Sequence, residues 1–246
     1  MKFLERTFPI RIADCDVNNF WRPSAILTEL QETATLHSAA IGCGREKLLA
    51  AGLAWVVARL SLRMHRCPVS GETVTVRTFH RPNRHSFFPR FFVISDSRGE
   101  VIGEASSLWL LMDLESRQAV PPDRLPHPLP DNSDMPVPLP LPGNIPLVDA
   151  EETAAPWPVL FTDLDPNRHV NNTRYADWLC NVLGIETMSA HLLETLNIHY
   201  NTEVRPGQSP VMRLYRSENK VRLLGEVDGN PAFEIGAELV PIPESV

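Results

Sequence analysis

The chain has 246 residues with a formal net charge of −7, and its charged fraction of 22% is ordinary for a globular protein. A general nucleic-acid binder would carry an excess of Lys and Arg, and a membrane span would need about 18 consecutive apolar residues, so the sequence argues against both. The 4 cysteines show neither CxxC pairing nor metal-ligand spacing. Free thiols in a reducing compartment are therefore expected, with the cytoplasm as the default location and with no metal or cofactor.

The first half of the chain begins with a predicted helix at residues 24–41. Pro23 and Ser24 are typical of a helix start, and Gly42 is typical of a helix end. The residues that follow helical spacing on one side are Ile26, Leu27, Leu30, Ala34, His37 and Ile41.

Antiparallel strands are predicted after this helix, because apolar and polar residues alternate there. The predicted strands are residues 54–65, 73–79, 86–95 and 101–112. In the first of them the residues expected to share one face are Val56, Ala58, Leu60, Leu62 and Met64.

Proline is concentrated in the middle of the chain. Ten of the 23 prolines lie within residues 119–146. Proline blocks helix and disfavours sheet, so this stretch predicts an extended, semi-rigid connector. The predicted organisation is a first domain at residues 1–118, a Pro-rich linker at 119–148 and a second domain at 149–246.

The second half repeats the pattern of one helix followed by strands. A strand is expected at residues 159–162 and a helix at 173–183, with Asn171 or Asn172 as its N-cap. The later predicted strands are residues 193–201, 210–215, 221–227 and 232–240.

The two halves also resemble each other in sequence, which favours internal duplication. The first opens FPIRIADCDVNNFWRPSAILTELQETA and the second opens WPVLFTDLDPNRHVNNTRYADWLCNVL. Each runs from a strand-like segment through an Asp-x-Asp turn into a helix. One long helix on a curved antiparallel sheet is the hot-dog arrangement, so the predicted fold class is α+β with a tandem hot-dog fold.

The chemistry of the chain is concentrated in the turn before the second helix. Asp165, Asn167 and His169 bring an acid, an amide and an imidazole together, and Pro166 favours a fixed turn. A helix N-terminus just downstream favours negative charge, as a site for a developing oxyanion requires. Taken alone, an Asp-Pro-Asn triplet can equally be no more than a turn.

Five blocks of the sequence, in order, resemble the acyl-acyl-carrier-protein thioesterases of plant plastids and bacteria. The blocks are LQETATLHSAAIG (30–42), AWVVARLSL (54–62), SGETVTVRT (70–78), SSLWLLMDLESRQ (106–118) and DLDPNRHVNN (163–172). The resemblance implies hydrolysis of the thioester that joins a fatty acyl chain to the phosphopantetheine arm of acyl carrier protein. It places the catalytic positions on Asp165, Asn167 and His169, and a fourth on Glu203 by its place before Arg205-Pro206-Gly207.

One departure from the family bears on the mechanism. Plant members have a cysteine after the glutamate, whereas this chain has Val204, and Cys180 lies on the predicted helix outside the motif. The resemblance therefore implies attack by water, or transient attack by a carboxylate. His169 or a carboxylate could be the base, Glu203 or Asp165 could orient the imidazole, and Asn167 with helix N–H groups near Asn172 could hold the oxyanion.

The first-half turn mimics the catalytic turn but has Phe20 where His169 stands. We therefore interpret it as a structural relic without chemistry.

The acyl chain needs an apolar slot, which is expected between the first-half helix and its sheet. The candidate lining residues, which would also suit an ordinary core, are Leu27, Leu30, Ala34, Trp55 and Val57.

Two basic segments are candidate docking surfaces for an acidic carrier protein. They are residues 77–90, with four arginines and two histidines, and the set Arg213, Arg216, Lys220 and Arg222. Either could also be an ordinary solvated sheet face.

Other functions stay open at this stage. An acyl-CoA thioesterase would use the same residues on another thiol carrier, and a non-enzymatic acyl-binding module would be expected to lack one or more of them. A hot-dog dehydratase is possible by fold alone, and a homodimer is possible. Neither nucleic acid nor a membrane span is expected.

Overall fold

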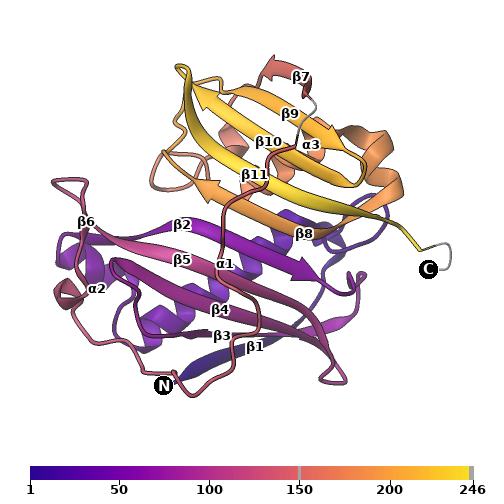
Figure 1. Ribbon diagram of the computed structural model, residues 1–246. Helices are drawn as coiled ribbons and strands as arrows, with labels where there is room; N and C mark the ends of the chain where they lie inside the picture. The colour runs from indigo at the N-terminus through magenta and orange to yellow at the C-terminus, as the bar shows by residue number, and fades with distance from the viewer. Residues whose placement is uncertain (149–150, 244–246) are drawn as a thin grey trace. The chain divides into compact units, whose positions relative to one another are not determined.

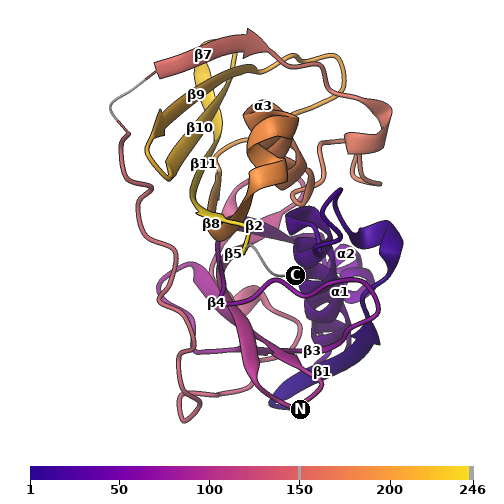
Figure 2. The ribbon, with the colours of Figure 1, turned by 90° about the vertical axis from the view of Figure 1, so that its right-hand side faces the viewer.

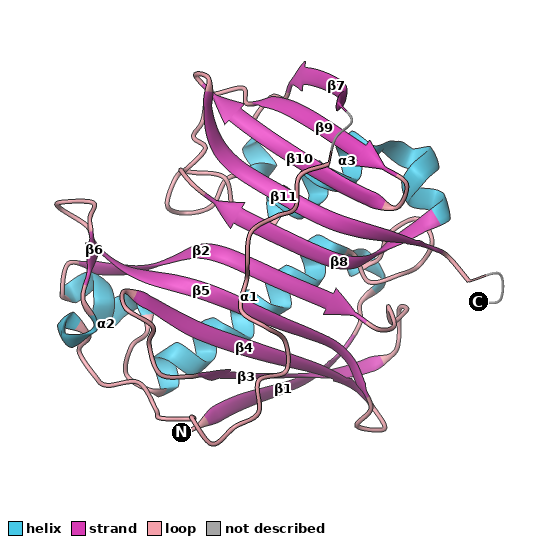
Figure 3. Ribbon diagram, viewed as in Figure 1, coloured by secondary structure: helices cyan, strands magenta, loops and turns pink. Residues whose placement is uncertain are grey.

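The computed structural model describes residues 1–148 and 151–243. The chain divides into two compact units, one made of Met1–Trp21 and Ala25–Pro142, the other of Arg22–Ser24 and Gly143–Val246. Each unit combines a long helix with an antiparallel sheet, so the chain has a tandem hot-dog fold (Figures 1 and 3). The division at Pro142 falls inside the predicted linker.

In the first unit the strands follow the order β1-β3-β4-β5-β2, with β6 paired to β5. The helix α1 lies behind these strands in Figure 1 and beside them in Figure 2. The helices are α1 (Pro23–Ala40) and α2 (Arg45–Ala50), and the short 3₁₀ turns are η1 (Ile12–Asp14) and η2 (Pro122–Arg124). The strands are β1 (Phe3–Pro9), β2 (Leu53–Met64), β3 (Thr73–His80), β4 (Phe87–Asp96), β5 (Val101–Asp113) and β6 (Ala119–Val120).

The apolar stripe predicted on the first helix is confirmed. Its first five members are buried and form the inner face of α1, whereas Ile41 is half-buried just beyond the helix end. The spacing of three and four residues places them on one side of the helix, where they cover the sheet. The buried members are Ile26, Leu27, Leu30, Ala34 and His37.

The face predicted for the side chains of β2 is wrong at Val56 and Ala58, the first two residues of the predicted set. Val57 pairs with Trp109 and Arg59 pairs with Leu108, which leaves Ala58 as an extra residue without its own partner. Such a bulge shifts the alternation by one residue. Val57 is therefore buried, at 9% exposure, while Val56 is half-buried on the other face.

In the second unit the strand order is β8-β11-β10-β9-β7. The helix α3 (Arg174–Ala190) is interrupted at Gly184, whose φ of 85° is not helical, so its first segment matches the predicted helix at 173–183. The strands are β7 (Glu151–Pro156), β8 (His191–Tyr200), β9 (Val211–Ser217), β10 (Lys220–Val227) and β11 (Asn230–Pro241).

The strand predicted at residues 159–162 is wrong. Residues Phe161–Asp163 instead form a short 3₁₀ turn, η3, and β7 pairs with β9 at the sheet edge. The turn is favoured because the Asp163 carboxylate accepts a hydrogen bond from the Leu160 N–H at 2.9 Å, as an acidic residue does in a capping box.

The proline-rich segment packs along the first unit up to Pro142. Asn132 is fully buried, and its amide donates to the carbonyls of Lys2 and His80 at 2.8 Å each. Ser106 donates to the Pro140 carbonyl at 2.6 Å, and Leu139 is buried. The segment is thus tied by side-chain hydrogen bonds to β3, to β5 and to Lys2, the residue before β1.

A buried polar cluster joins the end of α1 to β3 and β4. Arg90, which is 2% exposed, donates from Nη1 to His37 Nδ1 at 3.2 Å and to Thr78 Oγ1 at 3.1 Å. Its Nη2 donates to Ser38 Oγ at 2.9 Å and to His80 Nε2. Because a guanidinium can only donate, both imidazoles accept from it and are held in the neutral form.

The position of Arg90 near the last turn of α1 is favourable for a cation, because the carbonyl end of a helix is negative. Burial lowers the pKa of Arg90 to about 9. Burial also lowers the pKa of His37 to about 4, and the Arg90 charge acts in the same direction, while the Met1 carbonyl opposes it. The pKa of His80 is lowered by burial and then by Arg90.

This cluster predicts acid sensitivity of the first unit. The folded-state pKa of His37 lies below the ~6.5 of an unfolded imidazole, so the stability contribution is fully present above that pH. It is lost as the pH falls from ~6.5 toward about 4, by up to ~1.4 kcal/mol per pH unit for each such histidine. We expect urea unfolding to show this slope and the variant His37→Gln, which can still accept from Arg90, to show a shallower one.

The control for this prediction is His85→Gln, since His85 is exposed. Its stability should follow the wild-type curve through the same pH range. Parallel curves for wild type and His37→Gln would contradict the assignment.

Candidate functional site

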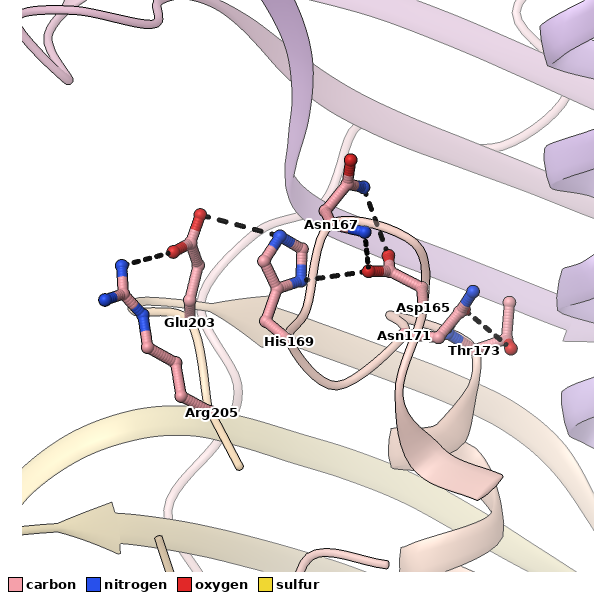
Figure 4. A network of polar contacts seen from close by, with 7 residues as sticks. All are labelled: Asp165, Asn167, His169, Asn171, Thr173, Glu203 and Arg205. Carbon is pink, nitrogen blue, oxygen red and sulfur yellow. Dashed lines mark hydrogen bonds and ion pairs between the residues drawn. The ribbon is translucent and has the colours of Figure 1, made fainter. Parts of the chain in front are cut away.

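The loop between η3 and α3 reverses tightly and is organised by backbone hydrogen bonds. The Asp165 N–H donates to the His169 carbonyl at 3.0 Å, and the Asp165 carbonyl accepts from the Arg168 N–H at 2.9 Å. Arg168 has a φ of 65°, in the left-handed region that closes such a turn. This geometry brings Asp165 and His169 side by side, as Figure 4 shows.

The Asp165 carboxylate is fixed by the residue two positions on. Its Oδ1 accepts from the Asn167 backbone N–H at 2.8 Å, and its Oδ2 accepts from the Asn167 side-chain amide at 3.3 Å (Figure 4). This is the hydrogen-bonding pattern that makes aspartate a turn residue. It also sets the direction in which the amide of Asn167 points.

Glu203 is brought close to the loop by a backbone hydrogen bond between residues far apart in the sequence. The Val170 N–H donates to the Val204 carbonyl at 2.8 Å, and Val204 is fully buried. Side chains alternate along an extended segment, so the residues on either side of Val204 point the opposite way. Glu203 and Arg205 therefore lie on the side that faces His169 (Figure 4).

His169 stands between two carboxylates. Its Nδ1 lies 3.8 Å from Asp165 Oδ1, and its Nε2 lies 3.7 Å from Glu203 Oε1. Both distances exceed hydrogen-bond length but suit ion pairs with a protonated ring. The side chains of His169 and Glu203 are each 25% exposed, so Glu203 does not point into bulk solvent. The structure brings these three residues together, and their catalytic role is a prediction.

The turn that leads into α3 is held by Asn171, whereas the N-cap position itself is Thr173 and not the expected Asn171 or Asn172. Its Oδ1 accepts from the N–H and from the hydroxyl of Thr173, each at 2.9 Å. Its carbonyl accepts from the Arg174 N–H at 2.9 Å. The expectation that helix N–H groups near Asn172 hold an oxyanion is therefore not met by Thr173 and Arg174, because both N–H groups bond to Asn171.

Tyr175 contacts the backbone next to Glu203, a contact that was not predicted from the sequence. It is buried at 3% exposure, it hydrogen-bonds to the Val204 backbone, and its ring packs edge-on against Phe233 at 4.6 Å. Burial raises its pKa, and the charges of Glu203 and Asp165 act in the same direction. A tyrosine at a helical core position gives no sequence signal for this contact.

The first-half turn has the same backbone hydrogen-bonding pattern as the loop that carries His169. The Asp16 N–H donates to the Phe20 carbonyl at 2.8 Å, and Asn19 has a φ of 66°. The Trp21 N–H donates to the Pro68 carbonyl at 2.9 Å, as Val170 donates to Val204. By this register Phe20, which is buried, stands where His169 is, and Cys67 stands where Glu203 is.

The candidate acyl-chain residues all lie in the first unit, whereas the four polar residues lie in the second. Leu27, Leu30 and Ala34 are buried on α1. Trp55 donates from its indole N–H to the Cys43 carbonyl at 3.1 Å and packs with Phe88, at 4.9 Å between ring centroids. Like Val57, these residues belong to the core of the unit, and their contact with substrate is a prediction.

The two basic segments carry less unpaired charge than their sequences suggest. In the first, Arg77 pairs with Glu5 and Arg90 is buried. In the second, the pairs are Arg213 with Glu226, Arg222 with Glu234 and Lys220 with Glu238. Docking at either segment stays a prediction.

In the described part of the chain, no cluster of three or more His, Cys, Asp or Glu side chains is arranged to hold a metal ion. None of the helices in the described ranges has the length and apolar character needed to cross a bilayer.

Comparison with known proteins decides the family. Residues 1–124 match the Acyl-ACP thioesterase N-terminal domain, and residues 148–225 match the Acyl-ACP thioesterase C-terminal domain. The chain belongs to the acyl-ACP thioesterase family. The resemblance inferred from the five sequence blocks is thereby confirmed.

Curated relatives are plant members of the acyl-ACP thioesterase family. A chloroplastic acyl-[acyl-carrier-protein] hydrolase of Cuphea viscosissima is 26% identical over 216 residues, which cover 80% of this chain and 51% of the relative. Oleoyl-acyl carrier protein thioesterase 2 of Arabidopsis thaliana, also chloroplastic, is 26% identical over 220 residues, covering 80% and 58%. The chain thus spans about half the length of the curated relatives it matches.

Solved structures share the tandem fold over nearly the full chain. A provisionally assigned oleoyl thioesterase from Lactobacillus plantarum has a TM-score of 0.81 and 27% identity, covering 98% of this chain and 97% of that chain. An acyl-ACP thioesterase from Bacteroides thetaiotaomicron has a TM-score of 0.85 at 21% identity, covering 97% and 98%, which supports the fold alone.

The contribution of Asn171 to the turn before α3 is testable by matched alanine variants. Asn171→Ala removes the acceptor for the Thr173 N–H, so we expect the free energy of unfolding to fall by ~1 kcal/mol. Asn172→Ala is the control, because the hydrogen bond from Tyr200 goes to the backbone carbonyl of Asn172. Chemical denaturation would measure the stability of both variants, and equal losses would contradict this role of Asn171.

Proposed function

We propose that this protein hydrolyses the thioester of fatty acyl-acyl carrier protein, releasing free fatty acid and ending chain elongation. The observation that carries the proposal is the imidazole of His169 between the carboxylates of Asp165 and Glu203, at 3.8 and 3.7 Å. Membership of the acyl-ACP thioesterase family supports the same reaction.

The chemical step needs a base for water and a place for negative charge. In the proposed step His169 takes a proton from water as the water oxygen attacks the thioester carbonyl carbon. The imidazolium so formed is stabilised by the two flanking carboxylates, as an acid stabilises the histidine of hydrolytic triads. The tetrahedral intermediate then expels the thiolate, which takes the proton back from the imidazolium. The products are a fatty acid and the free thiol of the carrier.

Two alternatives for the attacking group follow from the residues present. Glu203 or Asp165 could act as the base in place of His169, or attack the carbonyl transiently. Asp165 is the less suited of the two carboxylates, because both of its oxygens already accept hydrogen bonds from Asn167. Attack by a cysteine at the position after Glu203 is excluded, since that residue is Val204 and is fully buried.

Asn167 is the proposed donor to the oxyanion. It is exposed, and one of its amide N–H groups is held weakly by Asp165 at 3.3 Å. An amide oriented in this way can donate its other N–H to the carbonyl oxygen of a bound thioester.

We assign the two roles of the reaction to the two halves of the chain. The first domain, residues 1–118, would hold the acyl chain against Leu27, Leu30, Ala34, Trp55 and Val57. The second domain, residues 149–246, would carry out hydrolysis, with residues 119–148 as the connection. The expected partner is acyl carrier protein with its phosphopantetheine-linked chain, and homodimerisation and a cytoplasmic location are further predictions.

The catalytic assignment predicts large and specific losses of rate. His169→Gln, Glu203→Gln and Asp165→Asn should each lower kcat/KM by ~10²–10⁴, because each removes a part of the base and its charge support. Asn167→Ala should lower kcat/KM by ~10²–10³, because it removes a hydrogen-bond donor to the oxyanion. Hydrolysis of acyl carrier substrates with thiol detection measures the rates, and circular dichroism checks the fold. Cys180→Ser is the control and should retain activity; a loss there would contradict attack by water.

The carrier preference separates the leading proposal from the alternative of an acyl-CoA thioesterase. With one acyl chain on both carriers, we expect a higher kcat/KM on acyl carrier protein than on CoA. Faster hydrolysis of acyl-CoA would favour the alternative. Binding of acyl chains without turnover on either carrier would point to a non-enzymatic acyl-binding module.

A further inference from the structure

Arg205 is an ion-pair partner of the candidate site that lies outside the four residues matched to the family. Its Nη2 lies 3.0 Å from Glu203 Oε2, whereas the other carboxylate oxygen, Oε1, faces His169 Nε2 at 3.7 Å. Figure 4 shows the guanidinium and the imidazole on opposite sides of the same carboxylate. The two oxygens of Glu203 thus have different partners.

The backbone around Arg205 is fixed at both ends. Its N–H donates to Gln208 Oε1 at 2.7 Å, and its carbonyl accepts from the Gln208 N–H at 3.2 Å. On the other side Val204 is fully buried and its carbonyl is held by Val170. The alternation of an extended segment then leaves Glu203 and Arg205 on one face, so their pairing follows from the backbone.

We infer that Arg205 is a positioning residue of the hydrolytic site, which holds one oxygen of Glu203 so that the other faces His169. This inference rests on the proposed function and goes beyond the residues matched to the family. Arg205 does not touch the reacting atoms. It acts through the orientation and charge of Glu203.

The exposure of the ion pair between Arg205 and Glu203 indicates that Arg205 contributes little to folding stability. Its side chain is 61% exposed, and ion pairs at exposed positions contribute little to folding stability. Loss of Arg205 should therefore leave the thermal stability almost unchanged. Its effect should appear instead in the direction of the Glu203 carboxylate, which is held less firmly toward the imidazole without this ion pair.

The positive charge of Arg205 should also affect the pH at which the site takes up protons. The cluster contains two carboxylates and the imidazole, and the Arg205 guanidinium is paired with one of them, the Glu203 carboxylate. A neighbouring cation opposes the uptake of protons by carboxylates. Removing it should make the site take up protons at higher pH, and this direction is the same whether His169 or a carboxylate is the base.

The test compares Arg205→Gln with wild type on an acyl carrier substrate over a range of pH. We expect kcat to fall roughly tenfold with KM nearly unchanged, since misplacement of a catalytic group acts on the chemical step. The acidic limb of the profile of kcat/KM should move to higher pH, because a cation beside the carboxylate is lost. Arg205→Lys keeps the charge without the planar fork, so it should restore the pH limb more than kcat.

Arg174→Gln is the matched control. Arg174 also makes an exposed ion pair at 3.0 Å in the second unit, with Asp177. Its loss should leave kcat and the pH profile unchanged. If Arg174→Gln and Arg205→Gln have equal effects, or if Arg205→Gln changes neither kcat nor the acidic limb, the inference is overturned.

A measurement that does not depend on catalysis distinguishes failure of this inference from failure of the proposed function. The ¹³C resonance of the Glu203 carboxyl, followed by NMR against pH, should show its midpoint at higher pH in Arg205→Gln than in wild type. An unchanged midpoint would overturn the role of Arg205 even in an active enzyme. If wild type hydrolyses no thioester, the proposed function fails, and the NMR titration still decides whether Arg205 controls Glu203.

Discussion

The hydrogen bond from the Val170 N–H to the Val204 carbonyl is the constraint on which the candidate site depends. It joins the loop that carries His169 to a segment that follows β8, and so brings Glu203 to the imidazole. Tyr175 holds the same Val204 backbone from the start of α3. The site is therefore positioned by main-chain hydrogen bonds over a buried valine, and its polar side chains are placed on that frame.

Much of the loop could be predicted from the sequence because its rules are local. Asp165 and Asn167 form the turn expected of Asp-Pro-Asn, and Asn171 holds the turn before the helix, although the N-cap itself is Thr173. The position of Glu203 required the family resemblance, because nothing local links it to His169. Arg205 was missed as a partner of Glu203, although a spacing of two residues in an extended segment could have pointed to the pair.

The errors in the fold have equally specific causes. The predicted alternation of buried and exposed side chains along β2 is wrong up to Ala58, because a bulge adds one residue there. No residue type in that strand predicts the bulge. The strand expected at residues 159–162 is replaced by η3, where a single side-chain contact from Asp163 outweighs a weak apolar pattern. The buried network around Arg90 was also outside the reach of the sequence, because it joins residues of α1, β3 and β4 that only the fold brings together.

The turn from Asp16 to Phe20 in the first unit indicates how the candidate site could arise and change during evolution. The same reversal persists there with an aromatic ring in place of the imidazole and a thiol in place of the carboxylate. The backbone of this reversal therefore does not require the imidazole or the carboxylate of the candidate site. After a gene duplication, one copy could exchange its reactive side chains for packing ones without dismantling the scaffold, and selection on turnover could act on the other copy alone.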